Sequence, residues 1–168
     1  EGLLRQSYLR TASGATLINV LEYWFPGEND IQVIDSTFSR ANQSSDFGVI
    51  QAYLEIDDDR LDSRTESITV NEIGSYLNEQ DAIPLITNLP IWFIAEGEQN
   101  YEPLTLVVGL NTQKQTLTLQ SYWLGRYTLT FQEYARLQES SFEPYNYLVL
   151  TPKNNDLVTK SEKDFSGE

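Results

Sequence analysis

The sequence contains no cysteine and no histidine among its 168 residues. Without cysteine the chain has no disulfide, no thiolate nucleophile and no sulfur ligand for a metal. Without histidine it has no imidazole to act as a base near neutral pH or to bind a transition metal. The groups that remain for chemistry are carboxylates, hydroxyls and a few lysines. These absences exclude thiol-dependent and zinc-dependent hydrolysis, and we expect neither a cofactor nor a metal site.

Methionine and long apolar runs are also absent. The lack of methionine predicts that the chain starts inside a longer gene product, so flanking domains of the same polypeptide are expected. No run of 18 apolar residues occurs, and the start lacks a basic segment followed by an apolar one. We therefore expect a soluble domain with no transmembrane helix and no signal peptide. The compartment is left open, with export or the cell envelope as one option.

Basic residues are scarce relative to acidic ones. The chain has 11 Lys or Arg against 25 Asp or Glu, which gives a net charge of −14. An acidic surface repels phosphate backbones and anionic head groups, so nucleic acid and anionic membranes are disfavoured as partners. The length and a hydrophobic content of 40% predict one compact domain over residues 1–152. The polar residues 153–168 are expected to form a flexible tail or a linker.

A buried helix is predicted over residues 12–25, with the sequence ASGATLINVLEYWF. Its apolar residues, among them Leu17 and Leu21, recur at three- and four-residue spacing and cover most of the helix surface. Ser13 is a candidate N-cap, because its hydroxyl can accept a hydrogen bond from an unpaired backbone N–H. Pro26 ends the helix. We expect this helix to lie at the centre of the domain.

Other elements follow from apolar spacing and capping boxes. Helices are expected over 31–38, 47–54, 69–77 and 130–137. Strands are expected over 82–89, 91–94, 104–110, 116–120, 127–129 and 145–150. The acidic segment 55–67 has no apolar period and is interpreted as a solvated connection. This order predicts an α+β fold in which N-terminal helices pack on a mostly antiparallel sheet.

The order of motifs over residues 3–152 resembles the bacteriocin-leader-processing (double-glycine) cysteine peptidases, which have a papain-like fold. The resemblance rests on Gln6, the helix opening six residues later, the helix-strand unit 69–86, the hairpin 103–121 and the GRYTLT turn before the last strand. It implies a cysteine at the start of the helix and a glutamine six residues earlier that stabilises the oxyanion. It also implies a histidine that begins the central strand and an aspartate that ends the next one.

The catalytic residues implied by this resemblance are missing. By position the cysteine falls on Ala12, the histidine on Pro103 or its neighbour Glu102, and the aspartate on Ser121. Only Gln6 matches. Peptide cleavage needs the imidazole to take the thiol proton and the carboxylate to orient the imidazole. The resemblance therefore implies a natural pseudopeptidase that keeps the fold and is not an enzyme.

A degenerate cleft of this kind retains a groove for a peptide, so the expected partner is a peptide or protein segment. The expected binding residues are Gln6, Ser13, Trp92, Tyr101, Tyr122 and Trp123. Rigid aromatic rings can stack on a peptide or a sugar at low entropic cost. The alternative interpretation is that the same rings fill the groove as core.

Three other interpretations are open. The domain could serve as a scaffold that packs on a neighbouring domain. It could be a carboxylate-based hydrolase of glycans that uses Glu96, Glu98 or Glu102. The acidic run 57–59 could bind calcium, although it lacks the ligand spacing and glycine of a calcium loop and is more typical of a solvated surface. Ser13 as a substitute nucleophile would need a base that the sequence does not offer.

Overall fold

A computed structural model describes residues 11–40, 47–77, 82–90, 102–122 and 124–154. The helices are α1 (Ala12–Trp24), α2 (Ile31–Arg40), α3 (Phe47–Ile56), the 3₁₀ helix η2 (Val70–Ser75) and α4 (Phe131–Glu139). The strands are β1 (Leu61–Ser67), β2 (Leu85–Asn88), β3 (Leu104–Asn111), β4 (Thr116–Ser121), β5 (Gly125–Thr130) and β6 (Asn146–Pro152).

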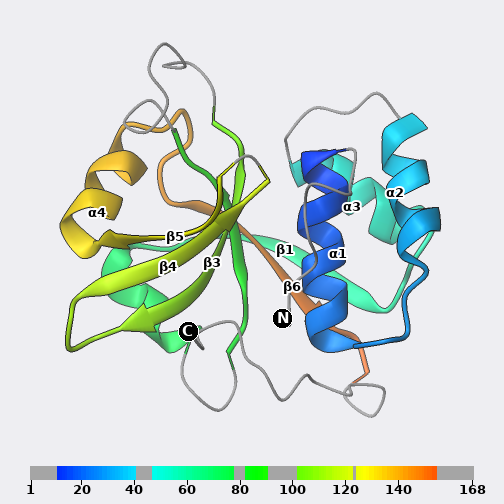
Figure 1. Ribbon diagram of the computed structural model, residues 1–168, viewed down its shortest axis with the longest axis horizontal. Coiled ribbons are helices and arrows are strands. Elements are labelled where there is room, and N and C mark those ends of the chain that lie inside the picture. The colour runs from blue at the N-terminus through cyan, green and yellow to red at the C-terminus, as the bar shows by residue number, and fades with distance from the viewer. Residues whose placement is uncertain (1–10, 41–46, 78–81, 91–101, 123, 155–168) are drawn as a thin grey trace.

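The strands form a six-stranded sheet in the order β1-β6-β2-β3-β4-β5, and every described ladder is antiparallel. The α+β class predicted from the sequence is thereby confirmed. In Figure 1 the three N-terminal helices lie over the end of the sheet that contains β1 and β6. Helix α1 also packs on β3, whereas β4 and β5 extend away from the helices. Strands β1 and β5 are the two edges.

Two hydrophobic clusters lie on opposite faces of the sheet. Residues of α1, α2 and α3 share one cluster with Leu104 and Leu106 of β3, and we call this side the α1 face. Residues of η2 and α4 share the other cluster with Leu117 and Leu119 of β4, and we call this side the α4 face. Side chains alternate between the faces because successive Cβ atoms of a strand point to opposite sides.

Helix α1 is buried on nearly every side, as its apolar composition predicts. Its N-cap is Thr11 and not Ser13: the Thr11 hydroxyl accepts a hydrogen bond of 3.0 Å from the backbone N–H of Gly14. Ser13 lies in the first turn and is buried. Thr11 and Ser13 both carry a hydroxyl that could cap the helix, and the extended backbone of Thr11 decides which one takes the position.

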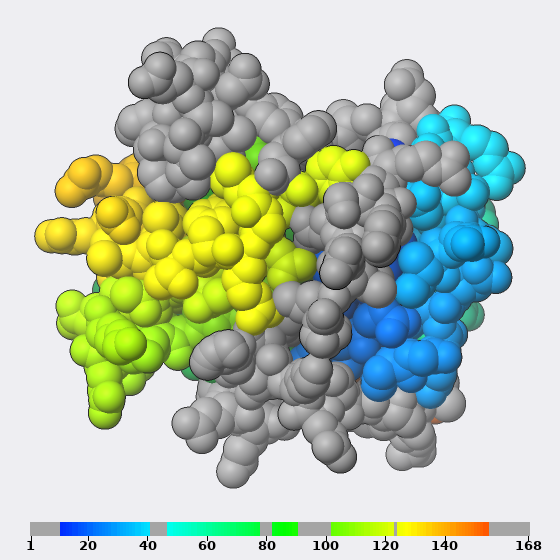
Figure 2. All heavy atoms as spheres, viewed as in Figure 1, coloured from blue at the N-terminus to red at the C-terminus, as the bar shows by residue number. Residues whose placement is uncertain are grey.

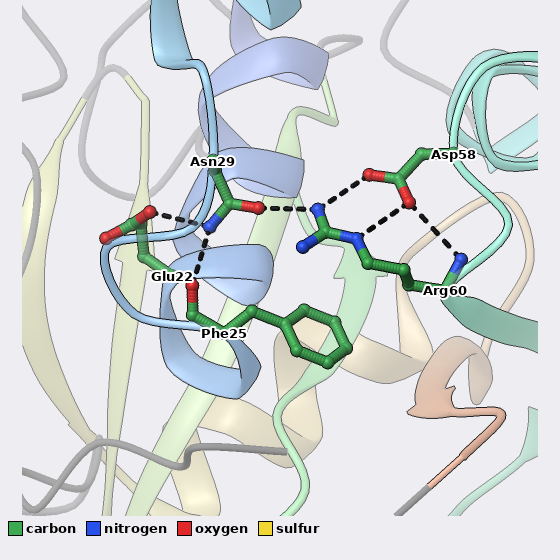
Figure 3. Close-up of polar contacts among 5 residues, drawn as sticks. All are labelled: Glu22, Phe25, Asn29, Asp58 and Arg60. Atoms are coloured by element: carbon green, nitrogen blue, oxygen red, sulfur yellow. Dashed lines mark hydrogen bonds and ion pairs between the residues drawn. The ribbon is translucent and has the colours of Figure 1, made fainter. Parts of the chain in front are cut away.

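A polar cluster joins the end of α1 to the turn between α3 and β1 (Figure 3). The Arg60 guanidinium donates to both carboxylate oxygens of Asp58, at 3.0 and 2.8 Å, and to Asn29 Oδ1 at 2.6 Å. It also lies 4.5 Å from the centroid of the Phe25 ring. Asn29 in turn donates to Glu22 at 2.6 Å. Paired charge and cation–π contact together fix this end of the helix.

The structure corrects two predicted elements. The acidic connection 55–67 contains the end of α3 and then strand β1, which pairs with β6 along its whole length. Strand β1 lies at the edge of the sheet and is open to solvent, so its side chains do not alternate between apolar and polar. Leu61 is its one buried residue. The helix expected over 69–77 is the short 3₁₀ helix η2. The capping box at Thr130 is confirmed, since Thr130 and Glu133 bond each other's backbone N–H.

Helix α4 is held by a buried polar network on the α4 face. The hydroxyls of Tyr134 and Tyr147 are 2.6 Å apart. Gln138 donates to the Tyr147 hydroxyl and, at 3.2 Å, to the carbonyl of Ile68. Burial raises the pKa of Tyr134 well above its ordinary value, so the network stays uncharged.

Candidate functional site

Ala12 begins α1, in the place that the resemblance gives to the nucleophile. Its side chain is a methyl group, and the chain has no cysteine anywhere. The protein therefore cannot act as a cysteine peptidase. Ser13 is about 1% exposed, so its hydroxyl is not presented at the surface as an attacking group.

Pro103 and Ser121 lie on neighbouring strands. Thr105 and Ser121 face each other in the register of β3 and β4, and Pro103 immediately precedes β3. Ser121 shares its side of β4 with Leu117 and Leu119, which belong to the α4 face. The structure thus brings Pro103 and Ser121 close along the sheet, but it places the Ser121 side chain on the face opposite α1.

Ser121 belongs to a buried group of hydroxyls on the α4 face. Tyr127 hydrogen-bonds with the side chains of Thr105 and Ser121. Burial raises the pKa of Tyr127 to about 12, although its two hydrogen bonds lower it. The Ser121 hydroxyl also accepts from the Leu124 N–H at 3.2 Å. These neutral hydroxyls include no base, so their arrangement supports packing and not acid–base chemistry.

Gln120, one residue earlier, points to the α1 face. It pairs with Leu106, which packs in the α1 cluster. Its side chain is about 4% exposed, and its Oε1 has no hydrogen-bond partner among the described residues. A shift of one residue along a strand moves a side chain to the other face. Of these two neighbouring residues, Gln120 lies on the same side of the sheet as Ala12, and Ser121 lies on the opposite side.

Two of the acidic candidates, Glu102 and Asp58, have structural partners. Both carboxylate oxygens of Glu102 accept from the Phe142 N–H, at 3.2 and 3.0 Å. Partial burial raises the pKa of Glu102. Asp58, in the middle of the acidic run, is bound by Arg60. Among the described residues no group of three or more acidic side chains is placed to hold a metal ion.

Of the aromatic residues expected in the cleft wall, Tyr122 lies within the described chain. It is half-buried and packs against the α1 cluster, which is the contact expected of a ring that fills the site. The remaining predicted residues and the strand predicted over 91–94 lie outside the described residues. These residues are Gln6, Trp92, Glu96, Glu98, Tyr101 and Trp123.

No protein-family model matches the chain, and no curated protein is significantly similar to it. Among the helices of the described residues, none has the length and apolar content needed to cross a bilayer. What the chain does must therefore be argued from its own geometry.

That geometry includes a surface that sequence reasoning did not single out. On the α1 face, strands β4 and β5 present a row of polar side chains that we call the threonine face. Its members are Thr116, Thr118, Gln120, Arg126, Thr128 and Thr130. The register pairs Thr116 with Thr130, Thr118 with Thr128, and Gln120 with Arg126. Figure 2 shows β4 and β5 at the surface on the same side of the molecule as the first helices.

The β5 members of the threonine face are exposed, Thr116 and Thr118 of β4 are half-buried, and Gln120 is buried. A sequence signal for this face exists. Thr128, Thr130 and Arg126 of β5 are exposed, whereas Leu129 between them is buried against α4. The repeated pattern Thr-Leu-Thr in β4 and in β5 marks two neighbouring strands with one polar side each. Pairing the two repeats across the turn would have identified this face.

Charge is divided unequally between the two parts of the chain. Residues 22–66, which contain α2, α3 and β1, carry 11 acidic and three basic side chains. Residues 103–132, which contain β3, β4 and β5, carry no acidic side chain and two basic ones, Lys114 and Arg126. Within a protein of net charge −14, the segment that forms β3, β4 and β5 is thus poor in acidic residues, although Glu133 bonds the Thr130 N–H at its end.

Proposed function

We propose that the chain is a catalytically inactive domain of papain-like fold, related to the bacteriocin-leader-processing peptidases, that binds a peptide or protein segment. It does so as one module of a larger polypeptide. The observation that carries the proposal is the threonine face, which is exposed along β5 and lies on the same side of the sheet as the buried helix α1. A peptide needs exposed polar groups and an accessible sheet edge to bind, and no catalytic triad.

Two features support the papain-like part of the proposal. The first helix is buried and contacts the strand that follows the predicted histidine position. The helices also precede an antiparallel sheet, in the order that the resemblance implies. The position of Ser121 on the α4 face argues for moving the aspartate position to Gln120, which has an amide in place of a carboxylate.

Peptide binding can be tested with a displayed library of random 12-residue peptides, selected against the whole chain. Peptides that bind are then measured against Thr128→Arg, which places a long charged side chain on the threonine face. The matched control is Thr65→Arg, the same change at an exposed threonine of the other edge strand, β1. The two variants have the same net charge, and circular dichroism checks that both are folded.

We expect Thr128→Arg to weaken peptide binding by about tenfold or more and Thr65→Arg to leave it unchanged. Failure of the library to yield any binding peptide would contradict the proposal and favour the scaffold interpretation. Equal loss in both variants would place the peptide elsewhere and remove the threonine face from the proposal.

A further inference from the structure

Two buried side-chain amides on the α1 face of the sheet have polar atoms without a partner. Asn19 of α1 is about 1% exposed, and neither its Nδ2 nor its Oδ1 has a hydrogen-bond partner among the described residues. Gln120 of β4 is about 4% exposed, and its Oε1 is likewise unpartnered within the described part of the chain. Buried polar atoms have partners in the great majority of cases, so these three atoms need a specific explanation.

Asn19 lies on the side of α1 that faces the strands. Tyr23, one turn further along the same side, donates from its hydroxyl to the carbonyl of Ala82 at 2.7 Å, and Ala82 precedes β2. The side of α1 that faces α2 is a different one, because a Cβ added to Gly14 would lie 3.3 Å from Phe38. Asn19 is five residues after Gly14, which turns it about 140° around the helix. The Asn19 amide therefore points away from α2 and toward the sheet.

Gln120 lies at the border between the α1 cluster and the exposed part of the threonine face. On one side it pairs with Leu106 of β3, and Tyr122, two residues further along the chain, also packs against the α1 cluster. On the other side it pairs with Arg126 of β5, whose side chain is exposed. A group that enters from the threonine face therefore reaches Gln120 before it reaches the side of α1 that carries Asn19.

We infer that Asn19 and Gln120 form a binding site for an uncharged primary carboxamide, supplied by an asparagine or glutamine side chain of the peptide. The inference rests on the proposed function and names the peptide side chain that the domain selects. The peptide lies along the threonine face, and one of its side chains passes Gln120 to reach α1. Both amides are buried in the free protein, so binding requires side chains at this border to change their rotamers.

The unpartnered atoms select the ligand by their number and kind. Asn19 Oδ1 and Gln120 Oε1 are acceptors, and Asn19 Nδ2 is a donor. A primary carboxamide offers two N–H groups and one C=O, which matches this set. A carboxylate only accepts and would face two oxygens, whereas an ammonium group only donates and would leave Nδ2 unpaired. Either charged group would also lose its hydration in so buried a place.

The first test uses propionamide as a probe and needs no peptide. When propionamide is added to the whole chain, the side-chain amide NMR signals of Asn19 and Gln120 should shift, with the weak affinity usual for so small a ligand. Propionate, a charged molecule of the same shape, should leave both signals in place. The Gln120 response should be lost in Asn19→Leu and kept in Gln138→Leu, which alters a buried glutamine of α4 whose Oε1 is also unpartnered among the described residues. No response to propionamide, or an equal response to propionate, would overturn the inference.

The second test uses the peptides selected from the displayed library. They should share an asparagine or glutamine, and replacing it with leucine should weaken binding about tenfold or more. Asn19→Leu should weaken binding of the same peptide by a similar factor, and the two changes together should cost little more than one, because they remove the same contact. Peptides that bind without a carboxamide side chain would overturn the inference and leave the proposed function intact. A response to propionamide combined with the absence of any binding peptide would support the carboxamide site and refute the proposed function.

Discussion

Replacing Asn19 with leucine is expected to stabilise the protein by about 1–2 kcal/mol. Asn19 lies in the middle of α1, is about 1% exposed, and neither Nδ2 nor Oδ1 has a hydrogen-bond partner among the described residues. A buried polar group without a partner costs about 1–3 kcal/mol. Leucine has the same branched shape, and its larger methyl groups take back about 1 kcal/mol through overpacking.

The assay is urea unfolding at 25 °C, supported by thermal unfolding, in which a gain of this size raises the midpoint by about 4 °C. Asn19→Asp serves as a check on burial, because an unpaired buried charge should cost about 3 kcal/mol or more. Gln138→Leu serves as the contrast: its Oε1 also has no partner among the described residues, but its Nε2 donates to Ile68 C=O and to the Tyr147 hydroxyl, so losing these two bonds should still destabilise by about 1–2 kcal/mol.

A folded Asn19→Leu variant that is less stable by more than about 1 kcal/mol would refute the reasoning, since it would mean that the amide is satisfied in solution. If the variant is more stable but binds peptide less well, the amide is retained for function at a cost in stability. Asn19 is seven residues after Ala12 and therefore lies on the same side of α1 as the degenerate nucleophile position.

Three further changes test how α1 is held. Gly14→Ala should destabilise the protein by about 1–2 kcal/mol in thermal unfolding, because the added Cβ would lie 2.7 Å from the Thr11 hydroxyl and disturb the N-cap. This loss outweighs the gain from the better helix propensity of alanine. Arg60→Lys should lower the free energy of unfolding in urea by about 1–2 kcal/mol, because lysine cannot bond both carboxylate oxygens of Asp58 or stack on the Phe25 ring as arginine does. An unchanged urea midpoint would contradict the stabilising role of this cluster. Partial burial alone would raise the pKa of Asp58, but hydrogen bonds and charge from Arg60 lower it below 3.8. The ionised Asp58 therefore stabilises the protein above pH 3.8, and this stabilisation should be lost as the pH falls further. In unfolding measured between pH 5 and pH 2, the Asp58→Asn variant should not show this part of the pH dependence.

The buried part of the fold could be predicted from the sequence because burial leaves an apolar pattern. Helix α1 and strand β3 are apolar on nearly all sides and were placed within a residue or two. Strand β1 could not be predicted, since its stability comes from backbone pairing with β6 and most of its side chains meet solvent. Backbone pairing between distant segments leaves little trace in side-chain type.

The candidate site was harder to predict than the fold because it depends on single-residue positions. Placing the cap at Ser13 instead of Thr11 is an error of two residues and changes little. On β4, Ser121 lies on the α4 face and its neighbour Gln120 on the α1 face, so a shift of one residue moves a side chain through the sheet to the other face. The sequence pattern gives elements to within a residue or two, whereas a site requires the correct face.

Residues 22–66 carry 11 acidic and three basic side chains, so acidic groups concentrate on α2, α3 and β1. On a positively charged resin or sensor surface, the protein should adsorb preferentially by this segment. Strand β5, at the other edge of the sheet, would then point into solution. Simple anion exchange should thus immobilise the domain in one preferred orientation, without a tag and with the β5 edge accessible.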